Sequence, residues 1–143
     1  MNPSIRRPFI LPSNGAGGEE WRGRGGQVKI IHYSEAGAKR YPSAQARGAT
    51  GRVVIGQADG AEKFCMRVFE IARGGKTGKH AHEWDHGVFV HSGKGAILRE
   101  GKWIPLSRGS VVFIPGNEEH QLKNTGEKPF IFVCVIPPGA PEL

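Results

Sequence analysis

The chain has 143 residues, of which 38% are hydrophobic and 23% are charged, and its formal net charge is +7. That length is typical of one domain with a hydrophobic core of its own. No apolar run approaches the roughly 20 residues that a membrane-spanning helix needs, and the opening residues lack the continuous apolar stretch of a secretory signal. We therefore predict a cytoplasmic protein without a membrane-bound segment.

The positive charge is concentrated in the first third of the sequence. Residues 1–52 contain nine Lys and Arg against three Glu, whereas residues 53–143 contain eleven Lys and Arg against ten Asp and Glu. The balance is therefore +6 in the first part and +1 in the second. A basic segment can bind nucleic acid or lie across an acidic neighbour in an oligomer. Because no nucleic-acid-binding motif accompanies it, we favour the oligomer.

The predicted elements begin with an extended arm. Residues 1–26 are rich in Gly, Pro and Arg and cannot form a core alone, whereas residues 27–143 form the predicted domain. In that domain short apolar runs alternate with Gly-containing turns, and no segment has helical periodicity over 11 residues. This pattern is typical of an antiparallel sandwich or barrel, with a hairpin turn at Glu100-Gly101. The predicted strands are residues 28–33, 52–56, 63–72, 86–91, 95–100, 102–106, 110–115, 120–124 and 130–136.

The two cysteines, Cys65 and Cys134, lie far apart within apolar stretches. A disulfide scaffold normally has more cysteines, and no C-x-x-C pair for zinc or redox chemistry is present. We therefore predict two reduced thiols in or near the core.

Three of the six histidines, His80, His82 and His86, fall within seven positions. On an extended strand His80 and His82 would point to the same face. A turn through residues 83–85 would then return the chain to the next strand at His86, so that three imidazoles converge. Unprotonated imidazoles suit zinc, copper, iron, nickel and, less tightly, manganese. The spacing indicates a metal site, although an H-x-H pair is also common on surfaces and in cores without a metal.

Two further histidines follow in the chain. His91 has the opposite parity to His86 on a continuous strand, so we expect it to face away from the cluster. His120 begins another strand after the tight turn at residues 115–119 and is the natural fourth ligand. If His120 faces inward, Leu122 does so too.

The histidines stand in two sequence motifs that resemble those of the cupin superfamily. The first motif spans residues 74–93, the second spans residues 109–124, and the resemblance covers roughly residues 48–138. Asn117 stands where the second motif has a glycine, which is a mild change because Asn tolerates left-handed backbone angles. His86 stands where the first motif usually has a glutamate. The motif residues here are Gly74, His80, His82, His86 and Gly93, then Gly109, Pro115, His120 and Asn124.

The resemblance implies an all-β fold, the cupin double-stranded β-helix or jelly-roll barrel, here with an extended N-terminal arm. With His86 in place of the glutamate, the motif resembles that of the small single-domain cupins with four histidine ligands. This implies one divalent transition metal per chain, which could be Mn, Fe, Ni, Cu or Zn. Without a carboxylate ligand the ion keeps its full charge, so we expect an anionic small-molecule substrate. The implied metal ligands are His80, His82, His86 and His120.

The same resemblance suggests which side chains line the pocket. It places Arg67 on the inner face of its strand, where a buried Arg would clamp an anionic substrate or pair with a carboxylate. The alternative is an Arg67 on the outer face. It also places one face of the last strand inward, and Cys134 is then a pocket-lining thiol rather than a nucleophile, since no base is assigned to it. The predicted pocket residues are Arg67, Leu122, Phe132 and Cys134.

Four carboxylates flank the histidines: Glu83, Asp85, Glu118 and Glu119. We expect Glu83 and Asp85 to lie in the turn without reaching the pocket. Either could accept a hydrogen bond from an imidazole N–H, or both could be solvated. The same alternatives hold for Glu118 and Glu119.

Cupins share one barrel across many functions, so the fold does not choose among them. We expect a metal-dependent enzyme, most plausibly a dioxygenase that acts on a small oxygenated or unsaturated anion. The alternatives are a non-redox isomerase, lyase or hydrolase acting on a molecule resembling a sugar acid, with the metal as Lewis acid, and a binding or sensing module without turnover. Because small cupins usually pair their sheets and the arm is long enough to reach a partner, we also predict a homodimer.

Overall fold

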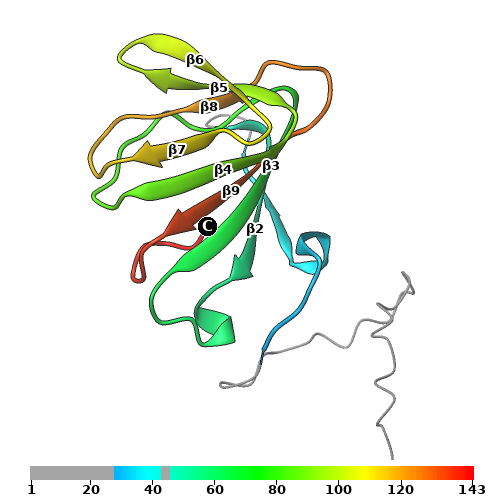
Figure 1. The fold of residues 1–143 in the computed structure, drawn as a ribbon, viewed down its shortest axis with the longest axis vertical. Coiled ribbons are helices and arrows are strands. Elements are labelled where there is room, and N and C mark those ends of the chain that lie inside the picture. Colours follow the sequence, from blue (N-terminus) through cyan, green and yellow to red (C-terminus); the bar gives the residue numbers. More distant parts are fainter. Residues whose placement is uncertain (1–27, 43–45) are drawn as a thin grey trace, which may run out of the picture.

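A computed structural model of the protein describes residues 28–42 and 46–143 (Figure 1). The arm predicted for residues 1–26 lies outside the described residues. No helix in this part of the chain is long and apolar enough to cross a membrane. The elements are η1 (Tyr33–Glu35), β1 (Ala38–Arg40), β2 (Arg47–Ile55), η2 (Gln57–Asp59), β3 (Cys65–Lys76), β4 (His86–Ser92), β5 (Lys94–Arg99), β6 (Lys102–Ser107), β7 (Val111–Ile114), β8 (Leu122–Asn124) and β9 (Phe130–Ile136), where η is a 3-10 helix.

The sequence-based strands match these elements, with one error and one omission. Residues 28–33 form no strand; Val28 is 81% exposed, and the segment ends in η1, where the His32 ring accepts a hydrogen bond from the backbone N–H of Ser34. The prediction was wrong because apolar character alone does not supply a neighbouring strand to pair with. The omission is β1 and the first half of β2, whose small and glycine residues carry little strand signal. The predicted hairpin at Glu100-Gly101 is confirmed, with both residues at positive φ.

Strand β3 holds the sheet together. The nine strands of the described residues lie in one sheet with the order β6-β5-β8-β3-β9-β4-β7. Strand β2 pairs with β3, β1 pairs with β2, and every pairing is antiparallel. Residues 65–71 of β3 pair with β9, whereas Lys76 pairs with β8. The strand therefore belongs to both halves of the sheet, which curls into the barrel seen in Figure 1. The predicted all-β jelly-roll fold is confirmed.

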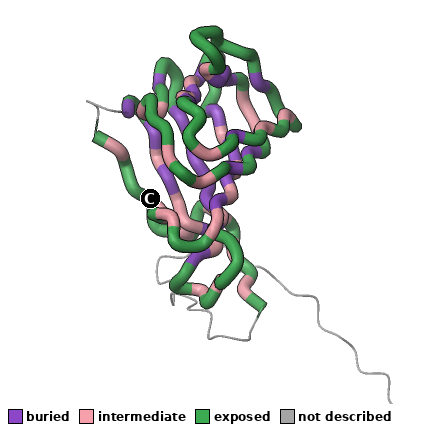
Figure 2. The backbone as a smooth tube through the Cα atoms, turned by 90° about the vertical axis from the view of Figure 1, so that its left-hand side faces the viewer, coloured by how far each residue is buried: buried purple, intermediate pink, exposed green. Residues whose placement is uncertain are grey.

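The core lies inside the curl, as the inner purple stripes of Figure 2 show. Residues alternate along β9, so that Phe130, Phe132, Cys134 and Ile136 are all buried. Val90 of β4 and Ile97 of β5 come from different halves of the sheet and belong to the same buried cluster. Both cysteines are buried and unpaired, as predicted.

The outer face of β4 and β7 carries exposed apolar side chains. Phe89 is 50% exposed, and its partner across the strand pair, Val111, is 77% exposed. His91 follows the same parity and is exposed, which confirms that it faces away from the buried side chain of His86.

Candidate metal centre

The histidines meet where the loop after β3 crosses the turn before β8. His80 and His120 form an isolated antiparallel bridge, in which each backbone N–H donates to the carbonyl of the other, at 3.2 and 3.0 Å. Apart from this bridge residues 77–85 form no strand, so the expectation of His80 and His82 on one continuous strand is wrong. The turn before His120 holds the loop in place, because the Asn117 N–H donates to the His82 carbonyl at 2.5 Å.

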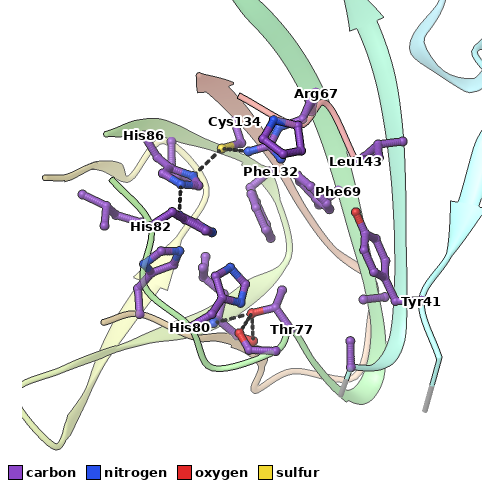
Figure 3. A pocket seen from close by; sticks show the side chains of 18 of the residues that line it. Tyr41, Arg67, Phe69, Thr77, His80, His82, His86, Phe132, Cys134 and Leu143 are labelled. Carbon is purple, nitrogen blue, oxygen red and sulfur yellow. Dashed lines mark hydrogen bonds between the residues drawn. The ribbon is translucent and has the colours of Figure 1, made fainter. Parts of the chain in front are cut away.

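The imidazole rings of His80, His82, His86 and His120 converge at this crossing, and Figure 3 labels the first three of them. The nitrogens that His80, His82 and His120 offer lie within 4.8 Å of one another, which is a metal-competent cluster. His86 enters from the first residue of β4, and its Nε2 lies 3.0 Å from Nδ1 of His82. The centroid of the His86 ring also lies 4.9 Å from the centroid of the His120 ring. The structure thus shows a cluster of three histidines with a fourth ring in contact with it.

Neighbouring groups orient these rings. His120 donates from Nδ1 to the backbone carbonyl of Glu118 at 2.9 Å, which leaves its Nε2 free to accept or to bind an ion. The indole of Trp84 stacks on the His82 ring, with centroids 4.5 Å apart and an interplanar angle of 9°. The Nδ1 of His86 lies 3.3 Å from Sγ of Cys134. Each of these three rings therefore has a partner that fixes its plane.

Burial favours the neutral form of three of the imidazoles, those of His80, His82 and His86. It lowers the pKa of His82 to about 4 and that of His86 to about 3, with smaller contributions from neighbouring histidines and from Arg67. Burial also lowers the pKa of His80, helped by His120 and Arg67. Neutral imidazole is the form that binds a metal ion, so these three rings can bind an ion at neutral pH without first losing a proton.

The cluster opens into a cavity of about 370 Å³. All four residues predicted to line a substrate pocket do lie on its wall: Arg67, Leu122, Phe132 and Cys134. Sequence reasoning missed other wall residues, including Tyr41, Thr77 and Leu143. Tyr41 and Leu143 carry no local signal, since they reach the cavity only through the fold. Trp84 also lines the cavity, and its position between two candidate ligands is a signal that could have found it.

Arg67 is 8% exposed and lies on the inner face of β3. Its Nη2 donates to Sγ of Cys134 at 3.0 Å, and its Nη1 donates to the carbonyl of Glu142 at 3.5 Å. The guanidinium carbon lies 5.0 Å from the centroid of the Phe69 ring. Its Nε is buried with no hydrogen-bond partner, and no carboxylate among the described residues pairs with it.

The flanking carboxylates stay out of the cavity. Glu83 and Asp85 are exposed, and neither lines its wall. Glu119 forms a surface ion pair with Lys79 at 3.3 Å. Of these four residues, Glu118 alone accepts a hydrogen bond from a histidine ring, that of His120, and it does so with its backbone carbonyl rather than its carboxylate.

Comparison with known proteins identifies the family. The model of the Cupin_2 domain matches residues 67–136. The structure of the polyketide cyclase RemF from Streptomyces resistomycificus superposes with a TM-score of 0.71 at 30% identity, and the match covers 78% of this chain and 80% of that one. The chain belongs to the cupin superfamily. This cupin is therefore related in sequence as well as in fold to an enzyme of similar size.

Curated relatives match smaller parts of this cupin. A glucose-6-phosphate isomerase from Thermococcus onnurineus is 40% identical over 57 residues, which are 36% of this chain and only 30% of that enzyme. A 1-methylthio-D-xylulose 5-phosphate methylsulfurylase from Rhodospirillum rubrum is 28% identical over 109 residues, or 76% of this chain and 65% of that protein. The chain thus spans less than a third of the length of the isomerase.

Proposed function

We propose that this cupin is a metal-dependent enzyme whose single divalent ion is held by His80, His82, His86 and His120. The observation that carries the proposal is the convergence of four imidazoles on the wall of one cavity. Nitrogens that share one ion at about 2.1 Å lie roughly 3.0–3.4 Å apart, and the 3.0 Å between His82 and His86 is within this range. In this arrangement His86 binds through Nε2, while its Nδ1–H donates to Cys134.

The best-supported reaction is a rearrangement without net oxidation. A bound divalent ion supplies a Lewis acid that polarises a carbonyl oxygen. The chain's own residues exclude water, through the apolar wall, and orient the substrate, through Arg67. The names of two relatives, an isomerase and a cyclase, favour this class. Cys134 takes no nucleophilic role, because burial raises the pKa of its thiol despite the neighbouring Arg67.

The dioxygenase expected from the sequence is the second candidate. One observation favours it: no carboxylate lines the described cavity wall. A substrate that arrives already ionised, as an enolate does, needs no base there. Neither the family nor the relatives reported above point to oxygen chemistry.

Metal analysis followed by oxygen measurement separates these candidates. The purified protein should contain one divalent ion per chain and should convert carbonyl substrates when loaded with zinc. Oxygen uptake with 1,3-diketones, or with catechol-like and flavonol-like compounds, only in the iron, manganese or copper forms would favour the dioxygenase. Stoichiometric metal without turnover of any compound would favour a binding module. A protein without metal after reconstitution would contradict the proposal.

We also propose that the protein is a homodimer to which the arm at residues 1–26 contributes. Sedimentation of the full chain and of residues 27–143 tests this. The full chain should sediment as a dimer. The shorter chain should form a weaker dimer, so that it sediments as a monomer at protein concentrations at which the full chain is still dimeric. An unchanged profile would assign the arm another role.

A further inference from the structure

We infer that the cavity selects an apolar, unsaturated substrate with a single anionic oxygen group, and that Arg67 is the residue that recognises this anion. The inference rests on the proposed function, since it names the substrate class of the same cavity. It does not depend on which metal is bound or on which reaction follows.

The charge of the cavity supports an anion. Among the described residues no Asp or Glu side chain lies on its wall, and Arg67 is the one permanently charged side chain there. A buried cation without a counter-charge is costly, and the acceptors it has are a thiol and one carbonyl at 3.5 Å. The two Nη groups carry four N–H donors and make these two bonds, so they have donor capacity left for a ligand. A carboxylate or enolate oxygen in the cavity would supply the missing acceptor and the missing charge.

The position of Arg67 places this anion beside the histidines. Sγ of Cys134 lies 3.0 Å from Nη2 of Arg67 and 3.3 Å from Nδ1 of His86, so one sulfur atom separates the guanidinium from a candidate ligand (Figure 3). A small molecule held by Arg67 therefore lies next to the metal centre. This arrangement binds one end of the substrate at Arg67 and leaves its adjacent carbonyl near the ion.

The other residues of the cavity wall determine which carbon skeleton the cavity can bind. Phe69 and Phe132 stack with centroids 5.4 Å apart, and Val88, Ile114, Leu122 and Leu143 complete an apolar surface. The Thr77 hydroxyl is already engaged, because it accepts from the Leu122 N–H at 3.0 Å. Apart from the Tyr41 hydroxyl, the several hydroxyls of a sugar phosphate would find few partners on this wall, and each unsatisfied one costs about 1–3 kcal/mol. Flat, conjugated carbon skeletons meet no such penalty.

Three probe ligands test the inference on the unmodified protein. Calorimetry on zinc-loaded full-length protein would compare 2-naphthoate, its neutral analogue 2-naphthalenemethanol, and glucose 6-phosphate. We expect 2-naphthoate to bind at least about tenfold more tightly than either of the others. Equal binding of the neutral analogue would overturn the role of the anion, and tighter binding of glucose 6-phosphate would overturn the apolar class.

A matched pair of variants assigns the anion to Arg67 rather than to the ion. Arg67→Met removes the charge at similar length, and Arg73→Met removes an exposed charge from the same strand. Arg67→Met should lose at least about tenfold in 2-naphthoate affinity and keep its zinc, while Arg73→Met should match the wild type. Unchanged affinity in Arg67→Met would overturn the inference.

A second readout keeps the two proposals separable. The preference for 2-naphthoate over its neutral analogue should persist in the metal-free wild type, since it originates at Arg67. If the protein binds no zinc but keeps this preference, the proposed metal enzyme fails and the anion site stands. If the preference for 2-naphthoate is lost when zinc is removed, the ion rather than Arg67 recognises the anion, and the inference fails.

Discussion

A β-carbon at position 116 would lie 2.1 Å from the backbone carbonyl oxygen of Glu83, so only glycine lets these two segments touch. Gly116 belongs to the turn of the second cupin motif, and Glu83 lies in the histidine loop of the first. The hydrogen bond from Asn117 to the His82 carbonyl follows directly after this contact. The two motifs are therefore joined through their backbones, which sets the spacing of His82 and His120.

Replacing Gly116 should disturb the fold and the metal centre together. Gly116→Ala should lower the free energy of unfolding by about 1–3 kcal/mol, the usual cost of forcing extra atoms into a packed site, and should weaken zinc binding. Gly37→Ala is the control, because a β-carbon there meets nothing within 4 Å. Urea unfolding and competition with a zinc-binding dye measure the two effects. Wild-type zinc affinity in Gly116→Ala would show that this contact does not set the ligand spacing.

The proposed metal ligands can be tested by replacing histidines that face the cluster and, as a control, a histidine that faces away from it. His120→Ala should abolish stoichiometric metal binding, and His86→Ala should weaken it strongly, because each removes one of the converging nitrogens. His91→Ala should retain the metal, since His91 lies on the same strand as His86 but on its exposed face. Metal content after dialysis measures all three. Equal content in the three variants would contradict the proposed ligands.

The metal-free protein should lose stability as the pH falls. The folded-state pKa values of about 4 for His82 and about 3 for His86 lie below the ordinary value of 6.5. The unfolded chain therefore takes up protons at a higher pH than the folded chain, and the free energy of unfolding should decrease from about pH 6.5 down to about pH 4. Urea midpoints measured at intervals over this range test the direction. His86→Leu should show a shallower dependence than the wild type, and identical slopes would argue that His86 is not buried as a neutral group.

Asn124, the last residue of the second motif, should matter for stability and not for the metal. Its Nδ2 donates to the carbonyls of Ile71 and Lys128 at 2.9 and 2.8 Å, and its Oδ1 accepts from the Gly126 N–H at 2.8 Å. Asn124→Ala leaves the buried carbonyl of Ile71 and two partly buried backbone groups unpaired, and should cost roughly 1–3 kcal/mol. Thr125→Ala, at an exposed neighbour, should be near neutral. Loss of zinc from folded Asn124→Ala would contradict this separation.

The parts of the molecule that sequence reasoning predicted are those with a local signal. Alternation along β4 and β9 predicted which side chains share a face, and the resemblance to cupins predicted which face of β9 is buried. The motif spacing predicted which histidines come together. Strand β1 was not predicted because its three residues are all exposed and form no apolar face. The loop that carries His82 was mistaken for a strand because the two-residue spacing of an H-x-H pair fits both conformations.

The cavity wall could be predicted only in part, for a different reason. Arg67, Phe132 and Cys134 lie on strands whose direction follows from the fold. Tyr41 and Leu143 lie outside the regular strands, and their packing against the cavity depends on contacts between distant parts of the chain. Whether Arg67 has a counter-charge was likewise a question of three-dimensional neighbours, which no pattern in the sequence answers.

The bridge between His80 and His120 has a kinetic consequence. It joins segments from either side of the β4–β7 region, which are far apart in the chain. Contacts between distant segments form late, so the complete set of imidazoles should exist only in the native state and not in the transition state of folding. A bound ion would then leave the folding rate almost unchanged and slow unfolding, so that its whole contribution would appear as a longer lifetime of the folded protein.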